Sequence, residues 1–315
     1  MGYPGPSIRL RSSARTSIGQ VRENNEDNIH LWARDSYVLA VVADGMGGAA
    51  AGEEASRLAI EAVQASFLDE TNHDLETLGD VQLSEQLRAM IYDANDRIVS
   101  KALSSPEYRG MGTTITLGFV RGMSAIFAHV GDSRAYLVDS DGRITQITSD
   151  HSFVEALLAA GHISREQAEE HPMRNVLYRA LGQADEVDVD LYYKRLRVGN
   201  RLVLCSDGLT RHVKPNEIAR LALQSDNPDT VSQQLIDLAN ERGGEDNISV
   251  IVIAVEATAP TVTAEQSTLT ADEDETLILR DRIDPHHAGS SDATPQPDDI
   301  KMSAERLSDD EQPDD

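Results

Sequence analysis

Short apolar runs joined by tight turns constrain the fold of this chain more than any other feature. TTITLGFV (113–120) and SAIFAHVG (124–131) are separated only by Arg121-Gly122-Met123, and the stretch 135–148 contains Asp141-Gly142, a strong hairpin signal. Hairpin connections join antiparallel strands. The sequence therefore predicts antiparallel sheets rather than repeated strand–helix–strand units.

Longer apolar runs and helical stripes complete the pattern. YVLAVVA (37–43), RLVLC (201–205) and NISVIVIAV (247–255) are typical of buried strands, and two short strands are expected between Ala14 and Ala33. Apolar residues at helical spacing predict two pairs of helices. These are expected after GMGGAAAG (45–52), over 83–103, near 215–224 and over 228–241.

Two helical pairs can cover the outer faces of two sheets. This predicts an α+β fold, a four-layer α/β/β/α sandwich of two antiparallel sheets flanked by helices. Residues 1–11, with two Gly and two Pro, are expected to be a flexible leader, and 12–256 the folded domain. The polar stretch at about 152–183 breaks the strand pattern and is expected to be a small flap insertion.

The net charge of −26 is unevenly distributed. Residues 256–315 hold 17 Asp/Glu and four Lys/Arg, with no Phe, Trp, Tyr or Cys, so 257–315 is expected to be an acidic disordered tail. The acidic remainder argues against nucleic-acid or membrane partners. No apolar run approaches the ~20 residues of a membrane helix, and the N-terminus lacks a signal-peptide core. We expect a cytoplasmic protein, most simply a monomer.

Five aspartates lie beside these apolar runs although they are spread over more than two hundred residues. A carboxylate at a strand end is held rigidly and reaches solvent, and several together are costly unless cations neutralise them. The pattern predicts a multi-metal hydrolytic site with hard cations such as Mg²⁺ or Mn²⁺. The five are Asp27, Asp44, Asp132, Asp207 and Asp246.

The glycine-rich stretch after the first buried run admits other interpretations. Gly45-Met46-Gly47 resembles part of a dinucleotide fingerprint, but Asp44 would place a carboxylate close to a pyrophosphate. Gly47 and Gly52 have the spacing of a phosphate loop, yet Glu53-Glu54 replaces the required Lys-Ser/Thr. A sharp turn with close backbone approach is the simpler interpretation.

Six motifs follow one another along residues 12–256. They closely resemble those of the metal-dependent Ser/Thr protein phosphatases of the type 2C (PPM) family, in their bacterial form. Each motif alone is weak, but their order makes the resemblance specific. The motifs are Arg22-x-x-Asn25-Glu26-Asp27, Asp44-Gly45-Met46-Gly47-Gly48, Gly112-Thr113-Thr114, Gly131-Asp132-Ser133-Arg134, Ser206-Asp207-Gly208 and Asp246-Asn247.

The resemblance implies a role for each metal-site residue. Asp44 resembles the carboxylate that bridges two metal ions, and Gly45 a ligand through its backbone carbonyl. Asp207 and Asp246 resemble ligands of one ion. Asp132, together with Asp207, resembles the acid that holds a third, weaker ion.

Further residues would complete the site. Asp27 belongs to the metal site, where it and Glu26 resemble partners of metal-bound waters. Arg22 resembles the phosphate clamp, since its planar fork matches two phosphoryl oxygens. Asn247 either orients its neighbour or caps the turn. Met46 occupies the position at which many eukaryotic members carry a His that looks like a general acid, so the proton donor is left open.

The resemblance implies a phosphoprotein phosphatase that acts on phosphoserine and phosphothreonine. It implies two Mn²⁺ or Mg²⁺ ions per site, with room for a third, and attack by a metal-bridging hydroxide. Expected partners are phosphorylated proteins, including Ser/Thr kinases or their substrates. The alternative is a non-catalytic phosphopeptide-binding or regulatory protein on the same fold, which the loss of a ligand would have favoured.

Overall fold

The computed structural model describes residues 8–34, 36–68 and 75–258, which fold into two antiparallel sheets. The first sheet has five strands in the order β1-β11-β10-β7-β8. They are β1 (Ile8–Ser17), β11 (Ile248–Ala257), β10 (Arg201–Cys205), β7 (Arg134–Val138) and β8 (Ile144–Gln146).

The second sheet has the order β2-β3-β5-β6-β9, with the short β4 paired to the end of β3. Its strands are β2 (Asp27–Ala33), β3 (Tyr37–Met46), β4 (Gly112–Thr113), β5 (Ile115–Arg121), β6 (Ser124–Val130) and β9 (Asp190–Arg195). The β5–β6 and β7–β8 hairpins form at the turns that the sequence predicts.

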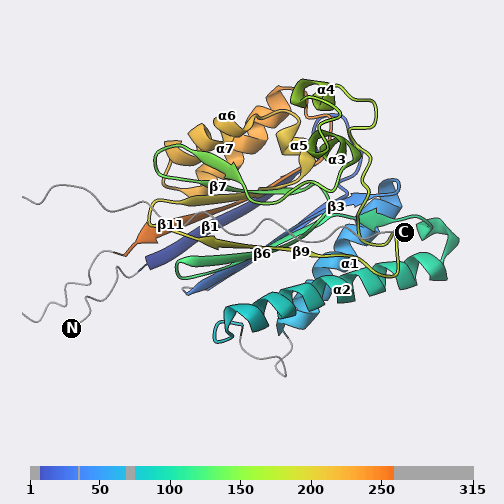
Figure 1. The fold of residues 1–315 in the computed structure, drawn as a ribbon, viewed down its shortest axis with the longest axis horizontal. Coiled ribbons are helices and arrows are strands. Elements are labelled where there is room, and N and C mark those ends of the chain that lie inside the picture. The colour runs from blue at the N-terminus through green and yellow to red at the C-terminus, as the bar shows by residue number, and fades with distance from the viewer. Residues whose placement is uncertain (1–7, 35, 69–74, 259–315) are drawn as a thin grey trace, which may run out of the picture. The chain divides into compact units, whose positions relative to one another are not determined.

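Helices cover the outer faces of both sheets (Figure 1). The pair α1 (Ala49–Leu68) and α2 (Asp80–Ser104) lies against the second sheet, and the pair α6 (Pro215–Gln224) and α7 (Pro228–Glu241) against the first. The short α5 (Asp207–Thr210) follows β10 directly, and a 3₁₀ turn (Pro106–Tyr108) follows α2. The predicted four-layer sandwich is therefore confirmed.

Three apolar clusters hold the four layers together. In β3, Leu39 and Val41 pack against the early helices, whereas Val38, Ala40 and Val42 face the other sheet. Successive side chains of a strand point to opposite faces. Because both faces of β3 are buried, its sequence is apolar without alternation.

The stretch from Ser152 to about residue 183, which the sequence analysis expected to be a flap, contributes no strand to either sheet. It contains α3 (Phe153–Ala159) and α4 (Arg165–Glu169). An isolated bridge from Thr113 to Leu181 ties its C-terminal part to β4, and a bridge between Ser152 and Leu177 joins its beginning to its later part. No helix among the described residues is long and apolar enough to cross a membrane.

One predicted boundary was wrong at the N-terminal end. Strand β1 begins at Ile8, inside the range assigned to the leader, and pairs with β11 from the Ile8–Ala257 register onward. Leu10 is buried in the cluster between the sheets. Its burial was hard to predict because arginines flank it on both sides. The predicted acidic tail lies outside the described residues apart from positions 257 and 258.

Candidate metal-dependent active site

The pairing of β2 with β3 brings the first two aspartates together. In this antiparallel register Asp27 is directly opposite Asp44. Like charges in directly opposed positions destabilise a sheet. The fold therefore tolerates a repulsive pair at this point, which is typical of a site built for a ligand rather than for stability.

Backbone and hydroxyl contacts fix the end of β3. The Asp44 carbonyl accepts from the Thr114 amide at 2.9 Å and from the Thr113 hydroxyl at 2.9 Å. The Gly45 amide donates to the Glu26 carbonyl at 3.1 Å. Because these contacts join three segments, the Asp44 carboxylate is carried on a rigid support.

The first sheet contributes two more carboxylates. Asp207 begins α5 at the end of β10, and Asp246 precedes β11. Asn247 connects them to the β1–β2 loop, since its side chain donates to the Ile18 and Asn24 carbonyls and accepts from the Glu26 amide, all within 2.9 Å. The Asn247 side chain thus holds the β1–β2 loop in place.

A contact between the sheets places Asp27. The Ser206 hydroxyl donates to Asp27 Oδ2 at 2.7 Å and accepts from the Ser249 amide at 3.0 Å. The other carboxylate oxygen, Asp27 Oδ1, is buried without a hydrogen-bond partner. A buried, unpartnered acceptor beside further carboxylates is a position that a cation would satisfy.

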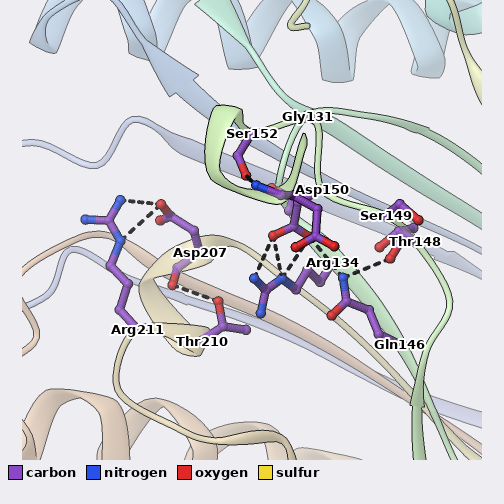
Figure 2. A network of polar contacts seen from close by, with 12 residues as sticks. Gly131, Arg134, Gln146, Thr148, Ser149, Asp150, Ser152, Asp207, Thr210 and Arg211 are labelled. Atoms are coloured by element: carbon purple, nitrogen blue, oxygen red, sulfur yellow. Dashed lines mark hydrogen bonds and ion pairs between the residues drawn. The ribbon is translucent and has the colours of Figure 1, made fainter. Parts of the chain in front are cut away.

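Asp132 lies in a loop held by the residues around it. Arg134 donates to both carboxylate oxygens of Asp150 at 2.6–3.0 Å (Figure 2). The Gly131 amide donates to His151 Nδ1 at 3.0 Å, and His151 is almost fully buried. Ser152 caps α3. We conclude that residues 150–152 hold the loop around Asp132 in place and begin the flap.

These segments meet at one pocket of about 270 Å³. It is lined by every site residue expected from the sequence except Asp27, which lies beneath the surface. Those residues are Arg22, Glu26, Asp44, Gly45, Asp132, Asp207, Asp246 and Asn247. Met46 also lines the pocket, and its sulfur accepts from Gln183 Nε2 at 3.6 Å.

Burial and mutual repulsion raise the carboxyl pKa values at the pocket. Burial raises the pKa of Asp44 well above its ordinary value, and the charges of Asp27 and Asp207 raise it further. Burial likewise raises the pKa of Asp132 to about 8, and the charge of Asp207 adds to this. Carboxylates that repel one another at short range can be neutralised by a hard divalent cation. Such a cation would favour their ionised forms.

Two arginines partly neutralise the same carboxylates. Arg22 pairs with Asp246 at 2.9 Å and approaches Glu26 at 3.8 Å. Arg211 contacts Asp207 and also pairs with Asp246 at 3.2 Å. Among the described residues, no group of three or more His, Cys, Asp or Glu side chains is arranged as a metal-binding cluster.

Arg211 is a charged pocket residue that the sequence analysis missed, along with Asn175 and Leu177. It stands four residues after Asp207, which places the two side chains on one face of a helix. The signal is visible only when α5 is known to begin at Asp207. His129, by contrast, is a buried residue of β6 outside the pocket lining, hydrogen-bonded to the Thr116 hydroxyl at 2.9 Å.

Gly45 allows a close approach of the backbone behind the pocket. A Cβ at this position would lie 2.1 Å from the Gly52 carbonyl oxygen and 2.6 Å from that of Glu26. Both obstacles are backbone atoms, so Gly45→Ala should destabilise the protein by about 3 kcal/mol. The measurement is thermal unfolding, with Gly79→Ala as control. A Cβ at Gly79 meets nothing closer than 3.9 Å, and its change should stay within about 1 kcal/mol. Equal melting temperatures for the two variants would contradict this packing.

Comparisons with known proteins agree with this architecture. Residues 16–242 match the family model described as protein phosphatase 2C. A putative protein phosphatase 2C-type of Streptococcus pyogenes is 38% identical over 245 residues, which is 78% of this chain and 97% of that protein. The serine/threonine protein phosphatase PstP of Mycobacterium tuberculosis is 41% identical over 249 residues, 79% of this chain but 46% of PstP.

One of the similar solved structures contains bound metal ions. The catalytic domain of PstP in complex with two manganese ions is 38% identical, with a TM-score of 0.68, over 79% of this chain and 100% of that chain. The fold and the family match define a metal-dependent phosphatase. The chain belongs to the protein phosphatase 2C family.

Proposed function

We propose that this protein removes phosphate from phosphoserine and phosphothreonine in phosphorylated proteins, using divalent cations held at the pocket. One observation carries the proposal: carboxylates from the ends of both sheets converge on one pocket that also holds Arg22. Negative side chains alone would repel a phosphate, whereas carboxylates that bind cations, with an arginine beside them, would attract it.

Each residue then has a role of its own. Asp44, Asp207 and Asp246 would bind the ions directly, with the Gly45 carbonyl as a further ligand. Asp132 would serve a third, weaker ion. When bound, the ions would supply activated water and neutralise phosphoryl charge. Asp27 and Glu26 would hold the waters around the ions.

Arg22 would bind the phosphoryl group. Its guanidinium is about half exposed, lies at the pocket and already pairs with Asp246. The planar fork can donate to two phosphoryl oxygens at once. Because those oxygens carry the charge that must be stabilised during transfer, Arg22 would assist both binding and reaction.

The manganese ions in the PstP structure make Mn²⁺ the first ion to test, with Mg²⁺ as the second. Both are hard cations that prefer oxygen ligands. The oxygen-rich lining of the pocket suits either ion. Phosphorylated Ser/Thr kinases or their substrates are the proposed physiological partners.

The reaction can be tested with a phosphothreonine peptide in ¹⁸O-labelled water with Mn²⁺. Attack on phosphorus should place the label in the released phosphate and leave the threonine hydroxyl unlabelled, as mass spectrometry would show. Label in the peptide would contradict the proposed attack. Tight peptide binding in calorimetry with no phosphate release would instead support the non-catalytic alternative.

The acidic tail is proposed to lie outside the catalytic domain. Every pocket residue lies before position 248, and β11 completes the first sheet by Ala257. Truncation after Thr258 should therefore change kcat/KM for a small phosphopeptide by less than about twofold. Steady-state kinetics of the full and truncated chains would check this. A large loss of activity in the truncated chain would show that the tail belongs to the catalytic unit.

A further inference from the structure

Arg211 contributes a fixed positive charge to the carboxylate cluster. Its guanidinium contacts Asp207 Oδ2 through both Nε, at 3.0 Å, and Nη2. Its third nitrogen, Nη1, lies 3.2 Å from Asp246 Oδ2. One side chain thus bridges the carboxylates at the ends of β10 and β11, and Figure 2 shows its contact with Asp207.

The local structure directs Arg211 toward these acids. The Arg211 amide donates to the Asp207 carbonyl at 2.9 Å, and the Thr210 hydroxyl donates to the same carbonyl at 3.2 Å. This closes a helical turn, in which residues four apart share a face. Among the described residues Asp207 has no ion-pair partner besides Arg211.

Arg211 and Arg22 differ in how firmly they are placed. The Arg211 side chain is 27% exposed, against 46% for Arg22. Arg211 also lines both the catalytic pocket and a neighbouring pocket of about 280 Å³ beside the flap. Because Arg211 lines both pockets, it borders open space outside the carboxylate cluster as well.

We propose that Arg211 is a tethered cation of the metal site, which competes with divalent ions for Asp207 and Asp246. This inference rests on the proposed function, because it takes these two aspartates as metal ligands. A carboxylate oxygen that accepts from a guanidinium has fewer free electron pairs for a metal ion. Arg211 therefore lowers metal affinity and stabilises the cluster between binding events.

The test is calorimetric titration of the full chain with Mn²⁺, comparing Arg211→Gln with the unaltered protein. The glutamine variant should bind Mn²⁺ on the order of tenfold more tightly, because the incoming ion no longer has to displace a positive charge from Asp207 and Asp246. In chelator its melting temperature should fall, because Asp207 and Asp246 then lose the counter-charge of Arg211. The gain in melting temperature on adding Mn²⁺ should be larger than for the unaltered protein.

A matched control separates a local from a general charge effect. Arg143→Gln removes one exposed arginine that pairs with Asp139 and Asp141 in the β7–β8 hairpin. Its Mn²⁺ affinity should equal that of the unaltered protein. If Arg143→Gln tightens Mn²⁺ binding as much as Arg211→Gln, the effect is one of net charge and the proposal is wrong.

Arg211→Lys keeps the charge but cannot bridge two carboxylates with the same fork, so its Mn²⁺ affinity should be intermediate. If the glutamine variant does not fold in chelator, the lysine variant provides the test. Unchanged or weaker Mn²⁺ binding in a folded Arg211 variant overturns the proposal. Calorimetry needs no turnover, so this failure is distinct from a failure of the proposed phosphatase activity.

Discussion

Replacing Asp44 by Asn should lower kcat/KM for a phosphothreonine peptide by on the order of 10³-fold. Asp44 is the carboxylate on which the repulsion at the pocket centres, since Asp27, Asp207, Asp132 and Asp246 all raise its pKa. The asparagine amide has the same shape as the carboxylate but carries no negative charge, so it cannot bridge two cations as Asp44 would. Losing several kcal/mol of charge stabilisation corresponds to a rate effect of this size.

The same variant should not lose stability in chelator. Since the pKa of Asp44 is raised in the folded state by burial and like charge, its ionised form destabilises the fold at pH values above the ordinary carboxyl pKa. Asparagine removes this cost, so thermal unfolding in chelator at neutral pH should give an equal or higher melting temperature. A lower activity with a higher melting temperature would separate a functional role from a structural one.

Asp141→Asn is the matched control, because it makes the same change in an Asp-Gly pair outside the pocket, at an exposed hairpin turn. Its kcat/KM should stay within about twofold of the unaltered protein. If Asp44→Asn keeps comparable activity, Asp44 is not a ligand on which catalysis depends.

Replacing Arg22 by Ala should lower kcat/KM by about 100-fold, the typical cost of removing one donor to a developing oxyanion. The alanine variant lacks the guanidinium that lies at the pocket beside Asp246 and Glu26. Arg22→Lys should recover part of the activity, because a lysine supplies charge without the planar fork. Inhibition by inorganic phosphate should be weakest in Arg22→Ala and intermediate in Arg22→Lys.

Arg57→Ala serves as the control for Arg22→Ala. Arg57 lies on α1, pairs with Glu54 and Glu61, and has nearly the same exposed fraction, 44% against 46%. It does not line the catalytic pocket. Its kcat/KM should remain within about twofold of that of the unaltered protein. Equal losses in the two variants would show that Arg22 acts only as a surface charge.

Local patterns predicted the layers because each layer leaves a local signal. The apolar run of β3 reports burial on both faces, and Asp141-Gly142 reports a hairpin. The convergence of aspartates was also predictable, since strand ends in packed sheets lie close together. The apolar runs did not predict the start of β1, because Leu10 is a single buried residue between two arginines.

Contacts between distant segments left no such signal. The Ser206–Asp27 hydrogen bond joins residues 179 positions apart and depends on how the two sheets are aligned. The glycine-rich stretch predicted a close backbone approach, but that Gly45 meets Gly52 depends on where α1 starts relative to β3. Arg211 reads as an ordinary surface arginine until the helical turn after Asp207 is in place.

The most direct test of the account is phosphate release from a phosphothreonine peptide by the full chain, measured across a titration of Mn²⁺ that begins in chelator. The account predicts no turnover in chelator, a saturable rise with Mn²⁺, and a return to no turnover when chelator is restored. Equal turnover with and without divalent cation would contradict the claim that the converging carboxylates work by holding metal ions.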